Sequence, residues 1–216
     1  QVDVYAGATA TGTPVRTLTA TRSGGSWTVA AGAPLAGGTY TARAAQSDQA
    51  GNTGRSAAVT FTVDTTAPAG LRITAPAANA SVATQTPTIS GRAGNATGDA
   101  TAVTVRVYAG ATATGTPVRT LSATRTGTNW SIAVSPALAD GQYTVQATQA
   151  DDVGNTATST AVSFRIDTVA PVLSITTPAA SARVRATPTI AGAAGILTGD
   201  SATVTVRVYA GATATG

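Results

Sequence analysis

Residues 4–18 and 107–121 share the same fifteen letters, VYAGATATGTPVRTL, and the segment begins a third time at 208–216. The tyrosines of the three copies, Tyr5, Tyr108 and Tyr209, are separated by 103 and 101 residues. A period of this length is too long for one turn of a solenoid, and it matches a whole β-sandwich domain. The sequence therefore predicts a tandem array of domains of about 100 residues each.

One full period, residues 68–170, has the alternation and turn punctuation of short strands. Apolar residues alternate with polar ones, and Gly, Pro, Asn or Asp falls in every gap. The expected strands cover residues 71–73 (A), 88–92 (B), 103–108 (C), 118–124, 130–134 (E), 143–148 (F) and 161–166 (G). Seven short strands in about 100 residues predict two antiparallel sheets packed face to face.

The segment LADGQY at 138–143 has the spacing of a tyrosine corner, in which the ring packs inward and its hydroxyl caps a nearby backbone group. The segment LAGGTY at 35–40 repeats this spacing. The predicted fold class is therefore all-β, with tandem seven-stranded immunoglobulin-like sandwiches.

Prolines that follow the last strand of each period, Pro68 and Pro171, set the expected domain boundaries. Residues 1–67 are expected to be a partial repeat with strands C to G. Residues 68–170 are expected to be a complete repeat, and residues 171–216 a partial repeat with strands A to C.

The composition excludes most catalytic chemistry. All 13 cationic residues are Arg and all 9 acidic residues are Asp, and Lys, Glu, His, Cys and Met are absent from the sequence. Lys, Glu and Met are strong helix formers and are absent, whereas the many Thr and Val residues favour strands. Without His or Cys there is no imidazole base, thiolate nucleophile, soft-metal ligand or disulfide. The sequence therefore predicts that the protein is not an enzyme.

The net charge of +4 does not indicate a nucleic-acid partner. The arginines are scattered singly, the closest pair being Arg183 and Arg185, and no stacking aromatic residues lie among them. This pattern is typical of solvated strand faces. No apolar run is long enough to span a bilayer, so we expect no membrane insertion in this segment.

The loop DDVGN at 151–155, followed by FRIDTVAP at 164–171, resembles the bacterial Ig-like (Big-type) tandem repeats of large cell-surface adhesins and extracellular filament proteins. The resemblance covers the entire chain. It implies export to the cell surface, tandem arrays of domains and, in some members, calcium at the domain junctions. It also implies a role as a stalk, shaft or extender that gives length and stiffness.

Acidic and amide side chains fall at the expected ends of the sandwiches. End-to-end stacking brings the end of one domain toward the loops of the next, and it brings Asp140 and Asp167 toward Asp200. Carboxylate and amide oxygens suit calcium, which takes six to eight oxygen ligands. In the other interpretation these side chains build turns at hairpin tips. The candidate calcium ligands are Asp64, Asp99, Asp151, Asp152, Asn155, Asp167 and Asp200.

The two tryptophans, Trp27 and Trp130, alternate with the apolar residues Val29 and Ile132. This spacing predicts that both rings pack in the core rather than form a sugar-stacking surface. A module that binds glycans or a host surface is the alternative function from another class, and an exposed aromatic patch would favour it.

The two partial repeats allow two interpretations. In one, the chain is a segment of a longer array of repeats, and its partners are the neighbouring repeats. In the other, the C-terminal part of one copy completes the N-terminal part of another, which makes a self-assembling fibre by strand exchange. Val206 and Val208 correspond to Val2 and Val4, so both ends carry the same strand and only one of them can occupy the slot. Both interpretations describe an extracellular structural protein.

Overall fold

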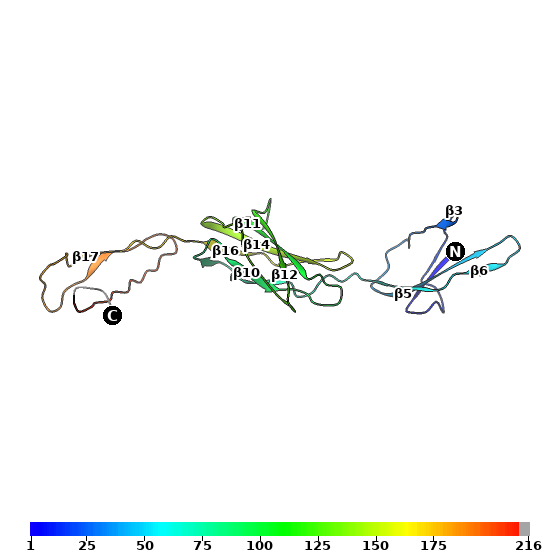
Figure 1. The fold of residues 1–216 in the computed structure, drawn as a ribbon, viewed down its shortest axis with the longest axis horizontal. Coiled ribbons are helices and arrows are strands. Elements are labelled where there is room, and N and C mark those ends of the chain that lie inside the picture. The colour runs from blue at the N-terminus through cyan, green and yellow to red at the C-terminus, as the bar shows by residue number, and fades with distance from the viewer. Residues whose placement is uncertain (212–216) are drawn as a thin grey trace.

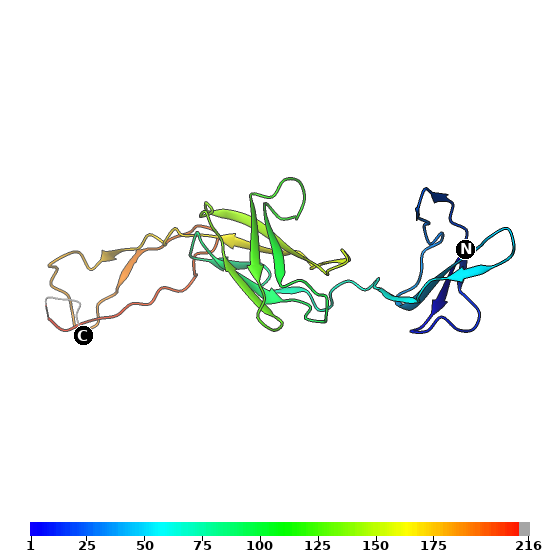
Figure 2. The same ribbon diagram turned by 45° about the vertical axis from the view of Figure 1, so that its right-hand side comes forward.

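The computed structural model describes residues 1–211, and every regular element in that range is a strand. The strands fall into three stretches that lie in a row along the longest axis (Figure 1). The same row is seen after a turn of 45° (Figure 2). The predicted all-β fold is confirmed.

The central stretch is a sandwich of two sheets. The smaller sheet has the order β13 (Asn129–Ala133), β10 (Thr88–Arg92), β8 (Arg72–Ala75). The larger sheet has the order β12 (Arg119–Thr124), β11 (Ala102–Ala109), β14 (Gly141–Ala150), β16 (Val162–Ile166), β9 (Ala80–Val82), and β15 (Thr156–Thr158) forms a hairpin with β14. All pairings are antiparallel except that of β16 with β9.

Each strand predicted within residues 68–170 is present, with ends that differ by a few residues. Two strands were missed, β9 and β15. Each has only three residues, which is too short for an alternating pattern to be recognised. The parallel pair of β9 and β16 extends the larger sheet with a strand from the start of the repeat.

The alternation in β11 produces the core. Val103, Val105 and Val107 are fully buried, while Thr104 and Arg106 between them are partly exposed. Ile89 and Trp130 face them from the smaller sheet as members of the same apolar cluster. Burying each such side chain contributes about 1.5–3 kcal/mol, so this cluster is the main source of stability.

Both predicted tyrosine corners are present. The Tyr143 hydroxyl donates a hydrogen bond to the Ala139 carbonyl at 3.0 Å, and its ring packs against Phe164. The Tyr40 hydroxyl donates to the Ala36 carbonyl at 3.0 Å. The loop before each long strand is therefore fixed to that strand.

The N-terminal stretch reproduces the larger sheet without the smaller one. Its strands β1 (Val2–Ala6), β2 (Arg16–Leu18), β5 (Gly38–Ser47), β6 (Thr53–Arg55) and β7 (Val59–Val63) pair in the order of the central ones. A short hairpin of β3 (Arg22–Ser23) and β4 (Ser26–Trp27) lies apart from that sheet. The C-terminal stretch holds one pair, β17 (Ser174–Thr177) with β18 (Ala191–Ala193).

The core position predicted for the tryptophans is right for Trp130 and wrong for Trp27. Trp130 is 3% exposed and Trp27 is 52% exposed. The reason is that β13 pairs with β10, whereas β4 pairs only with β3 among the described residues. Equivalent positions of the two repeats are therefore buried or exposed according to whether another strand pairs beside them.

We expect Tyr143→Phe to lower the free energy of unfolding by about 1 kcal/mol, because it removes one partly buried hydrogen bond. Urea unfolding followed by Trp130 fluorescence, in a Trp27→Phe background, measures the change. The matched control is Tyr40→Phe, which removes the equivalent hydrogen bond outside the complete sandwich. Equal effects of the two substitutions on this transition would contradict the expectation.

Candidate functional site at the repeat junctions

The loop after β14 is organised by one carboxylate. Asp151 Oδ1 accepts hydrogen bonds from the backbone N–H groups of Val153 and Asn155 at 3.0 and 2.8 Å, and Asp151 Oδ2 accepts from Asn155 Nδ2 at 2.7 Å. Gly154 permits the turn because its φ is +96°, in the left-handed region. Asp48 and Asn52 make the equivalent bonds in the N-terminal stretch. The spacing of Asp, Gly and Asn therefore builds a side-chain turn.

The same amide joins two stretches of the chain. Asn155 Nδ2 also donates to the backbone carbonyl of Asp64 at 3.1 Å. The Asp64 carboxylate accepts from the Thr66 N–H at 2.8 Å, just after β7. Asp64 and Asn155, two of the predicted junction residues, are thus brought together.

The segment between β7 and β8 lies against the central sandwich. Pro68 is buried, and a Cβ added to Gly94 would lie 3.0 Å from the Pro68 Cβ and 3.0 Å from the Ala69 nitrogen. Only glycine leaves room for this close approach. The equivalent pair Gly195 and Pro171 approaches as closely, with a corresponding distance of 2.9 Å, although Pro171 is exposed.

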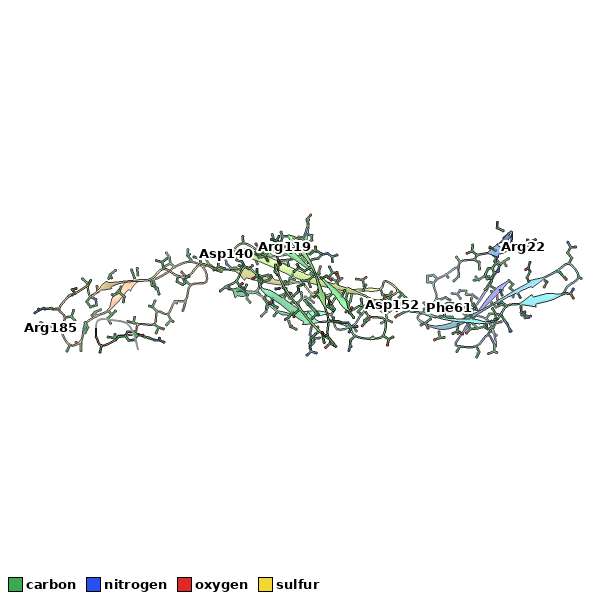
Figure 3. The ribbon with its side chains drawn as sticks, viewed as in Figure 1. Arg22, Phe61, Arg119, Asp140, Asp152 and Arg185 are labelled. Carbon is green, nitrogen blue, oxygen red and sulfur yellow. The ribbon has the colours of Figure 1, made fainter. Side chains whose placement is uncertain are left out.

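Three further predicted residues lie on the two loops of the central sandwich at the same junction. Asp99 forms an isolated bridge with Asp151, and its Oδ2 accepts from the Ala96 N–H at 2.9 Å. The Asp152 N–H donates to the Gly98 carbonyl at 2.9 Å. Figure 3 shows Asp152 at the end of the sandwich that faces the N-terminal stretch.

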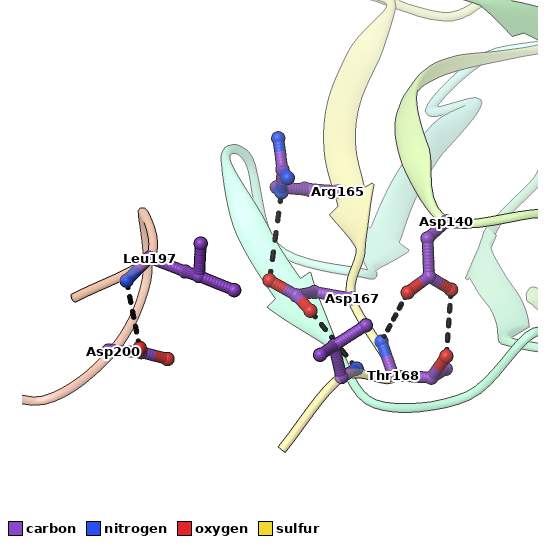
Figure 4. A network of polar contacts seen from close by, with 7 residues as sticks. Asp140, Arg165, Asp167, Thr168, Leu197 and Asp200 are labelled. Atoms are coloured by element: carbon purple, nitrogen blue, oxygen red, sulfur yellow. Dashed lines mark hydrogen bonds and ion pairs between the residues drawn. The ribbon is translucent and has the colours of Figure 1, made fainter. Parts of the chain in front are cut away.

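The second junction uses Asp140 and Asp167 (Figure 4). Asp140 accepts from the N–H and the hydroxyl of Thr168, both at 2.8 Å. Asp167 Oδ1 accepts from the Val169 N–H at 3.2 Å, and its Oδ2 lies 3.8 Å from Arg165 Nε. Asp200 Oδ2 accepts from the Leu197 N–H at 2.9 Å. A Cβ on the neighbouring Gly199 would lie 3.6 Å from Asp167 Oδ2, so Asp167 lies beside the loop that carries Asp200.

Two of these carboxylates have a lowered pKa. Burial acts to raise the pKa of Asp151, but the hydrogen bonds donated by Asn155, Val153 and Gly154 outweigh it and lower the pKa. The pKa of Asp140 is lowered chiefly by the two hydrogen bonds from Thr168. Both groups are therefore held in the charged form by N–H and O–H donors.

The acidic residues at the junctions bind backbone donors rather than one another. Within residues 1–211, no group of three or more acidic, His or Cys side chains is arranged to hold a metal ion. Asn155 directs its NH2 group, not its oxygen, at Asp64 and Asp151. This geometry gives the carboxylates a role in turns without a cation, and calcium at the junctions stays a prediction.

The sequence analysis missed Gln149, which is 1% exposed at the centre of this end of the sandwich. Its side chain accepts from the Gly94 N–H at 2.8 Å and donates to the carbonyls of Gly94 and Ala100 at 2.9 and 2.7 Å. These bonds tie strand β14 to the loop between β10 and β11. The sequence pattern that could have identified Gln149 is its place on the inward face of the strand, two residues after Ala147 in the series Tyr143, Val145 and Ala147.

Acid should weaken the junction loop. Because the pKa of Asp151 is lowered in the folded state, its stabilisation is present above the ordinary value of about 3.9 and is lost as the pH falls through the folded value. We expect Asp151→Asn to lower Tm at neutral pH and to reduce the further fall of Tm in acid. Circular dichroism melts across the pH range measure this, with Asp48→Asn as the matched control. An unchanged acid slope in Asp151→Asn would refute the assignment.

The calcium prediction is tested by the same melts at neutral pH. If the junction carboxylates act through turns alone, EDTA and millimolar calcium leave Tm unchanged. If they form a calcium site, calcium raises Tm by mass action and Asp64→Asn abolishes the rise.

The family comparison agrees with this architecture. The family of bacterial Ig-like domains matches residues 2–65 and 74–168, and the group 3 bacterial Ig-like domain matches residues 128–210. No curated protein matches the chain. Among solved structures it is similar to the fibronectin(III)-like modules of Clostridium thermocellum CbhA, at 19% identity and a TM-score of 0.38, over 76% of this chain and 75% of that one.

The family match covers most of the chain, and the two facing sheets, the tyrosine corners and the loop between β14 and β15 are present in the structure. The chain therefore belongs to the family of bacterial immunoglobulin-like domains.

Proposed function

We propose that this chain is a structural repeat region of a bacterial extracellular surface protein, in which it serves as a stalk or extender. The observation that carries this proposal is the ordered junction between residues 64 and 71. Asp64 is held by Asn155 across the junction, and Pro68 is buried against the central sandwich. A linker held in this way fixes the direction of the next domain.

The arrangement in a row gives length with few residues. The three stretches follow one another along one axis in both views (Figures 1 and 2). Flexible Gly/Ser linkers would leave the ends free to approach each other, whereas a hydrogen-bonded segment with a buried proline resists bending. Repetition of such a unit adds length without a new surface, which suits a spacer.

Several observations support an extracellular, non-catalytic role. Domains of this family typically occur in extracellular or surface proteins. The described residues contain no helix long and apolar enough to cross a membrane. The carboxylates of Asp99 and Asp151 accept hydrogen bonds from backbone donors, and the sequence has no His or Cys to serve as a base or nucleophile.

The glycan-binding alternative gains no support from the aromatic residues. Trp130 is buried, and Trp27, which is 52% exposed, is a single ring on the hairpin of β3 and β4. Neither ring forms an exposed platform on a complete sandwich. The stalk is therefore the function that the geometry supports best.

The stiffness of the first junction is measurable with spin labels, because the chain has no cysteine of its own. Thr62→Cys and Ser122→Cys place labels on exposed positions on either side of the junction. Electron–electron resonance, with unlabelled chain in excess, should give a narrow distance distribution. We expect Asn155→Ala to broaden it, because the contact with Asp64 is lost.

The matched control is Asn52→Ala, which removes the equivalent turn contact in the N-terminal stretch and leaves the junction intact. It should keep the narrow distribution. A broad distribution in the unsubstituted chain would show a floppy linker and would overturn the proposed stalk.

A further inference from the structure

Three segments of the central repeat have the sequence Asn-x-Ser/Thr, the motif at which a sugar is attached to an asparagine side chain. They begin at Asn79, Asn95 and Asn129, and they end at Ser81, Thr97 and Ser131. A motif of three residues also occurs by chance, so the structure around each asparagine decides which of them a transferase can reach.

Two of the three segments are held in the sheets. Asn79 Oδ1 accepts a hydrogen bond from the Ser163 hydroxyl at 3.1 Å, and Ser81 pairs with Arg165 where β9 joins β16. In the segment that begins at residue 129, the middle residue Trp130 is 3% exposed and belongs to the core. A transferase has to surround the asparagine and the hydroxyl residue, so neither segment can enter an active site while the sandwich is folded.

The remaining segment, residues 95–97, lies in the loop between β10 and β11. All three of its residues are exposed. Within residues 1–211, the side chains of Asn95 and Thr97 make no hydrogen bond to another protein group, and Gly94 and Gly98 on either side have no side chain to cover them. This loop therefore presents an accessible amide and an accessible hydroxyl two residues apart.

The turn that carries this segment is built without the asparagine side chain. Asp99 Oδ2 accepts from the Ala96 N–H at 2.9 Å, and the Asp99 N–H donates to the Ala96 carbonyl at 3.1 Å. In the next repeat Asp200 makes the same two bonds with Leu197, at 2.9 and 3.0 Å, and Ile196 stands in the place of the asparagine. The turn forms equally with either residue, so packing and hydrogen bonding do not explain the asparagine.

We propose that Asn95 is the acceptor of an N-linked sugar, which a glycosyltransferase adds to the folded chain from an activated sugar phosphate. The carboxamide nitrogen of Asn95 forms a bond to the anomeric carbon of the sugar, and the bond from that carbon to the phosphate oxygen of the donor breaks. The phosphate-bearing carrier leaves with the electron pair, and the proton lost by the amide nitrogen passes to a base of the transferase. This inference does not rest on the proposed stalk function.

A sugar at this position lies beside the first junction. Gly94, the residue before the acceptor, faces Pro68 and Ala69 of the segment that connects β7 to β8. A bulky, hydrated group on the next residue therefore covers the loop that this segment packs against. The second junction has no such acceptor, because Ile196 occupies the equivalent position.

Peptide mass mapping of the full chain, purified from the bacterium that produces it, tests the proposal. Every cationic side chain is Arg, so trypsin cleaves only after arginine and places the three motifs on separate peptides, 73–92, 93–106 and 126–165. We expect peptide 93–106 to be heavier by the mass of one or more sugar units, with fragment ions that place the sugar on Asn95. The other two peptides should have their unmodified masses.

Variants expressed in the same cells separate the motif from the loop. Asn95→Gln should abolish the modification, and Thr97→Ala should abolish it as well although the acceptor asparagine remains, because the transferase reads the hydroxyl. Thr97→Ser should keep it. The matched control is Thr101→Ala, which removes another exposed hydroxyl from the same peptide and should leave the sugar in place.

An unmodified peptide 93–106 in the protein from its own cells would overturn the proposal. A sugar that persists in Asn95→Gln would also overturn it, because the acceptor would then be a threonine hydroxyl. Sugars on all three peptides would show addition before folding and would contradict the selection of Asn95 by the folded loop. An unchanged circular dichroism melt verifies that each variant has folded.

Discussion

A sheet with one apolar face must be covered, and every other feature of this chain depends on that constraint. In the central repeat Val103, Val105 and Val107 meet Ile89 and Trp130, and water is excluded between the two sheets. The sequence has no cysteine, so no disulfide can replace this burial. The chain has few charged residues and many small side chains, so its stability comes mainly from a compact cluster of valines, isoleucines and a few aromatic rings. The strands that this cluster packs together hold the loops in place.

At the junctions, hydrogen bonds and close packing hold the loops at the ends of the sandwich. Asp64, Asp99 and Asp200 each accept a hydrogen bond from a backbone N–H, and the glycine that faces the linker proline lets the next segment approach closely. Buried Gln149 fixes the loop on which that glycine lies. The close approach of glycine and proline recurs at Gly195 and Pro171, although Pro171 is exposed. The repeated sequence thus reproduces this part of the geometry at both junctions.

The contrast between Trp27 and Trp130 shows that the burial of a side chain depends on which strands lie beside it. Both residues lie in matching local sequences, and each is preceded by a turn and a short strand. Only Trp130 has β10 beside it. Burial of these equivalent positions therefore follows from the strand that pairs beside each of them.

The sequence by itself determined the all-β fold, the period of the repeats, the main strands of the central repeat and both tyrosine corners, because alternation, turn residues and self-similarity are local properties. It also placed Asp64 and Asn155 at one junction. Tertiary structure decided the rest. The parallel strand at 80–82 depends on a partner about 84 residues away in sequence, the role of Gln149 depends on the loop that it meets, and the orientation of the Asn155 amide depends on which acceptors surround it. Burial of Trp130 and exposure of Trp27 were likewise settled by strands distant in sequence, since only packing between sheets decides which apolar face is removed from water.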